Sequence, residues 1–120
     1  MIARMWRGRT KAIDRDRYVE YLQRTGFPEY LATAGNRGLL AFRRVEADTA
    51  EFLLVTLWDS FDAIRRFAGA DAERAKYYPE DAAFLLEMDP RVTHFELVAR
   101  ERPRPREGDR PGAPSLRLTL

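Results

Sequence analysis

The sequence contains a single histidine, His94, and no cysteine. An imidazole has an ordinary pKa of about 6.5, so His94 is the one side chain expected to accept a proton at neutral pH. The absence of cysteine excludes thiolate catalysis, disulfide bonds and zinc–thiolate centres. A lone histidine on a strand can equally be a hydrogen-bonded structural residue, and that alternative stays open.

Alternating residues predict the strands that would position the candidate side chains. Residues 2–7 place Arg4 and Trp6 on one face of a first strand, before Gly8 and Thr10 loosen the chain. Residues 39–45 form a second strand, and residues 91–99 form the last one, which carries His94. The strand at residues 52–58 ends in Trp58 and is apolar on both faces, which is typical of a central strand in a sheet covered on both sides.

Helical spacing predicts the remaining elements. An amphipathic helix follows Asp14 and ends at Gly26. Ser60 can cap a helix that carries Phe67 and stops at Gly69. Residues 71–79 and 80–90 read as two further helical pieces, each closed by a proline, and the first of them carries Tyr77 and Tyr78.

The order strand, helix, strand, strand, broken helix, strand predicts an α+β, ferredoxin-like βαββαβ fold with a four-stranded antiparallel sheet. Such a sheet carries helices on one face only. The other face here would expose many Leu, Val and Phe side chains, more than a monomer usually leaves in water. We therefore expect a homodimer that packs sheet against sheet.

The charge distribution separates two regions. Residues 1–99 hold fifteen basic and sixteen acidic side chains, so the predicted domain is nearly neutral and we expect no nucleic-acid partner. Residues 100–120 hold six Arg and three acidic residues with four prolines, which predicts an extended or disordered arm. Its end, LRLTL (116–120), could add to a sheet edge. Without a membrane-length apolar run or a signal pattern, we expect no membrane partner and a soluble, cytoplasmic protein.

Three short motifs resemble those of one family. The TLWDS junction (56–60), the GNRG turn (35–38) and the THFEL strand (93–97) resemble the antibiotic biosynthesis monooxygenase (ABM) family of dimeric α/β barrels, over residues 1–99. The resemblance implies a ligand cavity between sheet and helices, with Trp58 near it. It also implies oxidation of an aromatic phenol or hydroquinone by O₂, with no metal, flavin or haem cofactor.

The resemblance assigns expected roles to seven side chains. His94 and Tyr77 are the catalytic candidates, as proton acceptor and hydrogen-bond donor. The expected substrate-binding residues are Trp58, Trp6, Tyr78, Arg4 and Phe67.

Several of these residues have structural alternatives. Trp58 could simply plug the end of the barrel, and Trp6 could face the dimer interface. Arg4 could pair with Glu96, and the two tyrosines could serve helix-end packing.

Two other functions remain open. The chain could be a non-catalytic dimeric module that binds a small molecule, because a fold does not fix a function. It could also bind haem, as another branch with this fold does. That branch's helix Trp and axial His fall at about Phe67 and Tyr77, and its Asn falls near Trp6 or Arg7, so none of the three is retained, although a tyrosine can ligate haem iron.

Overall fold

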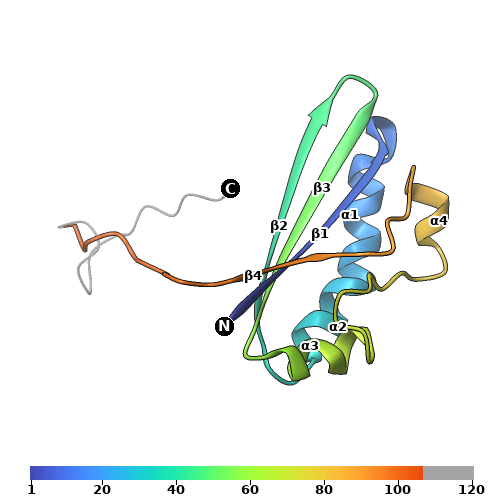
Figure 1. The fold of residues 1–120 in the computed structure, drawn as a ribbon. Coiled ribbons are helices and arrows are strands. Elements are labelled where there is room, and N and C mark those ends of the chain that lie inside the picture. The colour runs from blue at the N-terminus through green and yellow to red at the C-terminus, as the bar shows by residue number, and fades with distance from the viewer. Residues whose placement is uncertain (107–120) are drawn as a thin grey trace.

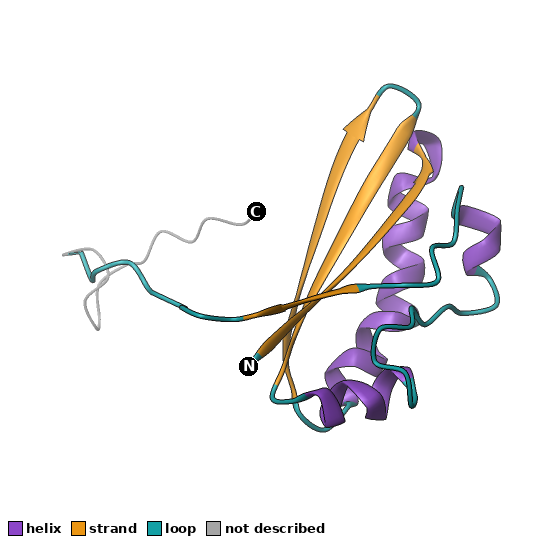
Figure 2. Ribbon diagram, in the orientation of Figure 1, coloured by secondary structure: helices purple, strands orange, loops and turns teal. Residues whose placement is uncertain are grey.

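A computed structural model describes residues 1–106. Four antiparallel strands form one sheet in the order β2-β3-β1-β4, and the helices lie on one side of it (Figures 1 and 2). The elements are β1 (Ile2–Lys11), η1 (Ala12–Asp14), α1 (Arg15–Arg24), α2 (Gly26–Ala32), β2 (Asn36–Glu46), β3 (Thr49–Trp58), α3 (Phe61–Ala68), α4 (Asp81–Phe84) and β4 (Thr93–Glu96). The predicted ferredoxin-like α+β fold is confirmed.

The two faces of the sheet differ in what covers them. Phe52, Leu54 and Trp58 of β3 point toward the helices and are buried, while the alternate residues Leu53 and Val55 point to the other face and are half-buried. The strand is central, as its apolar composition predicted. Within the single described chain, however, only one of its two faces is covered.

Helix α3 forms where the sequence predicts it. The Ser60 hydroxyl accepts a hydrogen bond from the Ala63 N–H at 3.1 Å and so satisfies one of the free amides at the helix start. Gly69 ends the helix with a φ of 95°, a conformation that favours glycine. The apolar spacing buries Ile64 and Phe67 against the sheet.

The prediction of a helix at residues 71–79 is wrong, and Tyr77 and Tyr78 do not lie on one. The backbone there pairs with a distant segment instead of with itself: the Ala75 N–H donates to the Pro90 carbonyl, and the Val92 N–H donates to the Glu73 carbonyl, both at 2.8 Å. These tertiary hydrogen bonds outweigh local helix propensity.

Other predicted boundaries also shift. Of residues 80–90, only Asp81–Phe84 is α-helical, because the Leu86 N–H then donates to the Arg9 carbonyl and draws the chain to β1. Strand β1 continues through Gly8 and Thr10 to Lys11, since the long β3 pairs with it throughout. Strand β4 covers only 93–96 of the expected 91–99, and Gly26 begins α2 instead of ending the helix before it.

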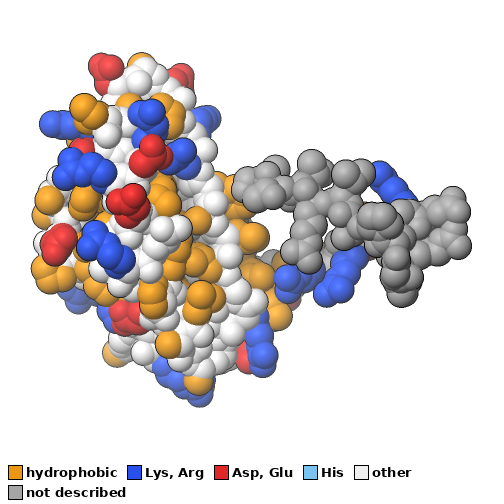
Figure 3. All heavy atoms as spheres, turned by 180° about the vertical axis from the view of Figure 1, so that it is seen from behind, with side chains coloured by type: hydrophobic (Ala, Val, Ile, Leu, Met, Phe, Trp, Pro, Cys, Tyr) orange, Lys and Arg blue, Asp and Glu red, His pale blue; other side chains and the backbone are white. Residues whose placement is uncertain are grey.

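The face of the sheet without helices carries exposed apolar side chains. Leu40, Phe42 and Phe95 are each slightly more than half exposed. Figure 3 shows apolar side chains among charged ones on the surface seen from behind the view of Figure 1.

The chain leaves the sheet after β4. Residues 97–106 have no helix or strand and run away from the body (Figure 1). The predicted edge strand at 116–120 lies outside the described residues. In residues 1–106, no helix has both the length and the apolar character needed to cross a membrane.

Candidate functional site

A small cavity lies between the sheet and the helices, at the place where the family resemblance puts the ligand. Its walls are largely aromatic: Trp6 from β1, Tyr18 from α1, Tyr30 from α2, and Tyr78 from the segment after α3. We call it the interlayer cavity. Its volume is about 20 Å³, so in this state it is nearly filled by its own side chains.

The interlayer cavity also carries a buried carboxylate, Asp81, at the start of α4. Asp81 is only 3% exposed. Its two oxygens accept hydrogen bonds from the Tyr18 hydroxyl at 3.1 Å and from the Tyr78 N–H at 2.6 Å. Burial raises the pKa of Asp81 above its ordinary value of 3.8, although both hydrogen bonds act in the opposite direction. Asp81 is therefore a stronger base than an exposed aspartate.

A second carboxylate, Glu29, binds two of the residues that line the cavity. The Glu29 carboxylate accepts hydrogen bonds from Lys76 and from the Tyr78 hydroxyl. Burial alone would raise the pKa of Glu29, but these two donors hold it below its ordinary value, so Glu29 is ionised at neutral pH. Burial and the nearby Glu29 raise the pKa of Tyr78, which keeps its hydroxyl protonated as a donor.

An open pocket adjoins the cavity on the far side of residues 74–78. It has a volume of about 760 Å³, and we call it the basic pocket. Its charged and aromatic lining residues are Arg65, Arg66, Arg74, Lys76, Phe67 and Tyr77. Lys76 lines both the basic pocket and the interlayer cavity, so the two spaces meet at its side chain.

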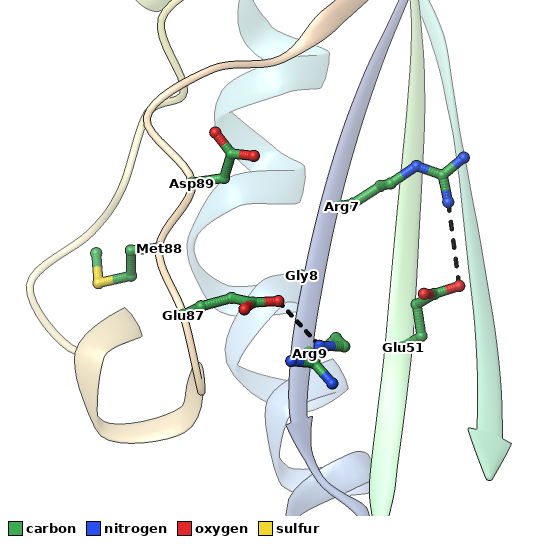
Figure 4. Close-up of a pocket in the computed structure, with 7 residues that line it drawn as sticks. All are labelled: Arg7, Gly8, Arg9, Glu51, Glu87, Met88 and Asp89. Carbon is green, nitrogen blue, oxygen red and sulfur yellow. Dashed lines mark hydrogen bonds and ion pairs between the residues drawn. The ribbon is translucent and has the colours of Figure 1, made fainter.

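A third pocket, of about 490 Å³, lies between β1 and residues 87–89 (Figure 4). Each of its two arginines lies near a carboxylate. Arg9 pairs with Glu87 at 2.9 Å, and Arg7 lies 4.0 Å from Glu51. The hydrogen bond from Arg9 lowers the pKa of Glu87. The third acidic lining residue, Asp89, forms no ion pair within residues 1–106, so the pocket carries one excess negative charge and does not suit an anionic ligand.

The structure buries Trp58 completely, without placing it among the residues that line the interlayer cavity. Its ring packs near Tyr30 and Phe67, with ring centroids 6.4 and 5.9 Å away. The indole N–H donates to the Thr56 hydroxyl at 2.8 Å. The ring is part of the core in this structure, and a role for Trp58 in ligand binding stays a prediction.

Trp6 and Arg4 lie on the helix-covered face of β1, and Trp6 lines the interlayer cavity. Arg4 is only 1% exposed, and its guanidinium donates to the Arg74 carbonyl at 2.7 Å and lies 5.5 Å from the centre of the Phe67 ring. Burial lowers the pKa of Arg4. In β4, the residue opposite Arg4 is His94, and Glu96 pairs with Ile2.

His94 lines neither the interlayer cavity nor the basic pocket. Its ring contacts Phe61 at 5.2 Å between centroids, and its Nε2 is buried without a hydrogen-bond partner. Burial and the charge of Arg4 lower the pKa of His94, so it is a weaker base than a free imidazole. Its role as proton acceptor stays a prediction.

Phe67 and Tyr77 both line the basic pocket, whereas Tyr78 turns to the interlayer cavity. The Tyr77 hydroxyl donates to the Asp89 carbonyl, and burial raises the pKa of Tyr77. The side chains of these two consecutive tyrosines thus lie on opposite sides of the same segment.

The sequence reading missed Asp81, Glu29 and Lys76. Asp81 and Lys76 fall in the predicted helical pieces and Glu29 lies outside every predicted helix, and no spacing rule joins Glu29 to Lys76 or Tyr18 to Asp81 across such separations. A partial signal was available: Asp81 follows the Tyr-Tyr-Pro run and begins an apolar stretch, as a helix-start acid does. In residues 1–106, no three His, Asp or Glu side chains gather closely enough to hold a metal ion.

Comparison with known proteins supports the fold. No family model and no curated protein matches the chain. Among solved structures, the NE2512 protein of unknown function from Nitrosomonas europaea superposes with a TM-score of 0.58 at 16% identity, covering 87% of this chain and 95% of that one. The chain shares its fold with such proteins.

A second solved structure is a mutant of MhuD with two manganese protoporphyrin IX molecules bound per active site. It gives a TM-score of 0.55 at 16% identity and covers 86% of this chain and 100% of that one. At these identities the likeness extends to the ferredoxin-like fold alone.

Proposed function

We propose that this chain, as a homodimer, binds an aromatic small molecule with an ionisable hydroxyl group in the interlayer cavity and oxidises it with O₂ without a cofactor. The observation that carries the proposal is Asp81: a buried carboxylate with a raised pKa, set against aromatic walls. This is the arrangement that removal of a proton from a phenol-like substrate requires.

The proposed reaction needs little from the protein. Asp81 accepts a proton from the substrate, and the resulting anion passes one electron to O₂. The radical pair recombines as a peroxide anion, which takes the proton back from Asp81 to form a hydroperoxide, and the hydroperoxide then loses water. For an anthrone, the CH₂ carbon becomes a carbonyl, one oxygen atom enters the product and the other leaves as water. The aromatic walls exclude bulk water during these steps.

Hydrogen-bond donors around the cavity would stabilise the substrate anion. The Tyr78 and Tyr18 hydroxyls remain protonated, because burial raises the pKa of both, and each would reach the anion by turning its single O–H away from Glu29 or Asp81. Arg4 adds a buried positive charge near Tyr30, where it opposes the effect of burial on the Tyr30 pKa. Hydrogen-bond donors that the fold holds in place before the reaction stabilise a developing anion more than water molecules would.

Access to the cavity requires one of its walls to move, because a volume of about 20 Å³ holds no more than about one water molecule, and we propose that residues 74–78 are the part that moves. This segment has no helical hydrogen bonds of its own. Much of its attachment comes from side chains, with Lys76 and Tyr78 both bound to Glu29. Such a segment can open without unfolding the sheet.

Oxygen consumption tests the proposal directly. Metal-free protein is incubated with a panel of anthrones and naphthols while dissolved O₂ is followed. We expect uptake with at least one of them, with product formed in proportion to the O₂ consumed. Binding of these compounds without any uptake would instead support the non-catalytic binding module.

The residues present do not favour haem ligation. The Tyr77 hydroxyl, at the position that corresponds to an axial ligand, donates to the Asp89 carbonyl. Iron prefers the tyrosinate, whereas burial raises the pKa of Tyr77 and so disfavours that form. We therefore derive no step through haem.

The proposed homodimer would cover the bare face of the sheet. Replacing Phe42 with Glu puts a charge from each protomer into the proposed apolar contact, so we expect this variant to sediment as a 14.0 kDa monomer. The wild-type protein should sediment at about twice that mass. Val45→Glu is the matched control, because Val45 is a similarly exposed apolar residue of β2 on the opposite face. A monomeric wild-type protein would contradict the dimer.

A further inference from the structure

Two arginines of the basic pocket have no carboxylate partner among residues 1–106. Arg65 pairs with Asp62 and Lys76 with Glu29. In contrast, Arg66 donates only to the Ala34 carbonyl, and within residues 1–106 no ion pair involves the Arg74 side chain. None of the described residues that line the pocket is acidic. The pocket therefore presents a net positive charge to solvent.

A buried guanidinium lies behind the floor of this pocket. Arg4 is bonded to the Arg74 carbonyl and lies over the Phe67 ring, so it sits directly beneath two lining residues. Its Nε has no hydrogen-bond partner, and no carboxylate in the described chain forms an ion pair with it. An uncompensated buried cation is costly and attracts an anion. Its charge adds to that of Arg66 and Arg74.

The pocket also has aromatic walls and a direct connection to the interlayer cavity. Phe67 and Tyr77 line it, and the Lys76 ammonium lies 4.9 Å from the centre of the Phe67 ring. On the other side of the same segment, Lys76 and Tyr78 line the cavity with Asp81. A ligand that displaces this segment would span both spaces.

We propose that the basic pocket binds a carboxylate group of the ligand whose hydroxylated ring enters the interlayer cavity. The substrates would then be hydroxylated aromatic carboxylates. This inference rests on the proposed function, because it places the reacting ring beside Asp81. Arg66 and Arg74 are the carboxylate-binding residues, and an arginine can hold a carboxylate through two parallel hydrogen bonds.

Two probes that differ only in the carboxylate test the inference: 2-naphthol and 6-hydroxy-2-naphthoate. Dissociation constants are measured by calorimetry on the full-length protein. We expect the naphthoate to bind about tenfold more tightly, because its carboxylate can accept charge-assisted hydrogen bonds from Arg66 and Arg74 and 2-naphthol has no group in that place. The double variant Arg66→Gln, Arg74→Gln should lose this preference and leave 2-naphthol binding unchanged.

The control is Arg24→Gln. Within residues 1–106, Arg24 of α1 also donates only to a backbone carbonyl, that of Glu20, so this variant removes one positive charge outside the basic pocket. It should keep the preference for the naphthoate. Equal affinity of wild-type protein for the two probes, or a preference that survives the double variant, would overturn the inference.

The outcomes separate the inference from the proposed function. Oxygen uptake with naphthols and no preference for the naphthoate leaves the oxidation standing and removes the carboxylate site. A preference that depends on Arg66 and Arg74, without oxygen uptake, leaves the carboxylate site standing and removes the oxidation.

Discussion

The Asp81→Asn variant should oxidise its substrate about 10²- to 10⁴-fold more slowly than the wild-type protein, which is the usual contribution of a positioned general base. Asparagine keeps the shape of the side chain and can still accept one hydrogen bond, but it cannot take up a proton. The initial rate of oxygen uptake at saturating substrate measures the effect. An unchanged rate would remove Asp81 from the chemistry.

The same variant makes a prediction about pH. In the wild-type protein the rate should fall as the pH falls through the pKa of Asp81, because the protonated carboxyl group cannot accept a proton. Burial raises that pKa, so the fall should be centred above 3.8. Asp81→Asn should lack this limb of the profile. His94→Ala is the comparison: if it is the variant that loses the limb, His94 is the base.

Stability provides an independent measure of the Asp81 environment. Because the folded state raises the pKa of Asp81, it binds the proton more tightly than the unfolded chain does. This contribution to the free energy of unfolding is present at low pH and is lost as the pH rises through the folded-state pKa. Wild-type protein should therefore gain stability relative to Asp81→Asn as the pH falls from neutral. Unfolding titrations of both proteins at several pH values measure this difference.

The parts of the fold that the sequence predicts are those set by neighbouring residues. Alternating apolar residues specify β3 and which face of it is buried. Ser60 and Gly69 mark the ends of α3 through hydrogen bonds and backbone geometry that depend on only a few residues. These local signals were sufficient for the element order and therefore for the fold class.

The segment between α3 and β4 could not be predicted, because distant contacts decide its conformation. The residues from Asp71 to Pro79 have helical composition. Their backbone nevertheless exchanges hydrogen bonds with Pro90 and Val92, and the Lys76 side chain reaches Glu29 on α2. A sequence window contains neither partner. The error carries into the site, since the same segment separates the interlayer cavity from the basic pocket and places Tyr77 and Tyr78 on different sides.

The candidate residues show the same difference between what local pattern determines and what distant contacts determine. Arg4 and Trp6 were placed correctly on one face of β1, because strand periodicity determines the face. The sequence did not predict Asp81 as a site residue, because its raised pKa depends on burial beside Tyr18, a distant residue of α1. Burial of a single polar side chain leaves no periodic trace in the sequence.

Replacing Gly8 with alanine should destabilise the fold by about 1–3 kcal/mol, as overpacking of a core usually does. Gly8 lies beneath the indole of Trp6 on β1, and an added Cβ would lie 2.2 Å from Cη2 of that ring. The ring has to move, and it forms one wall of the interlayer cavity. The variant should therefore lower the free energy of unfolding, measured by denaturant titration, and also weaken naphthol binding.

Gly26→Ala is the matched control for this prediction, because Gly26 also lines the interlayer cavity. An added Cβ there would have ordinary contacts of 3.8 Å with the Tyr30 and Tyr78 rings, and Gly26 is the first residue of α2, where alanine has a better helix propensity than glycine. It should match or exceed wild-type stability. If Gly8→Ala bound naphthols as tightly as wild-type protein despite its lower stability, Trp6 would not be a wall of the ligand site, and the aromatic cavity would lose its role in the proposed function.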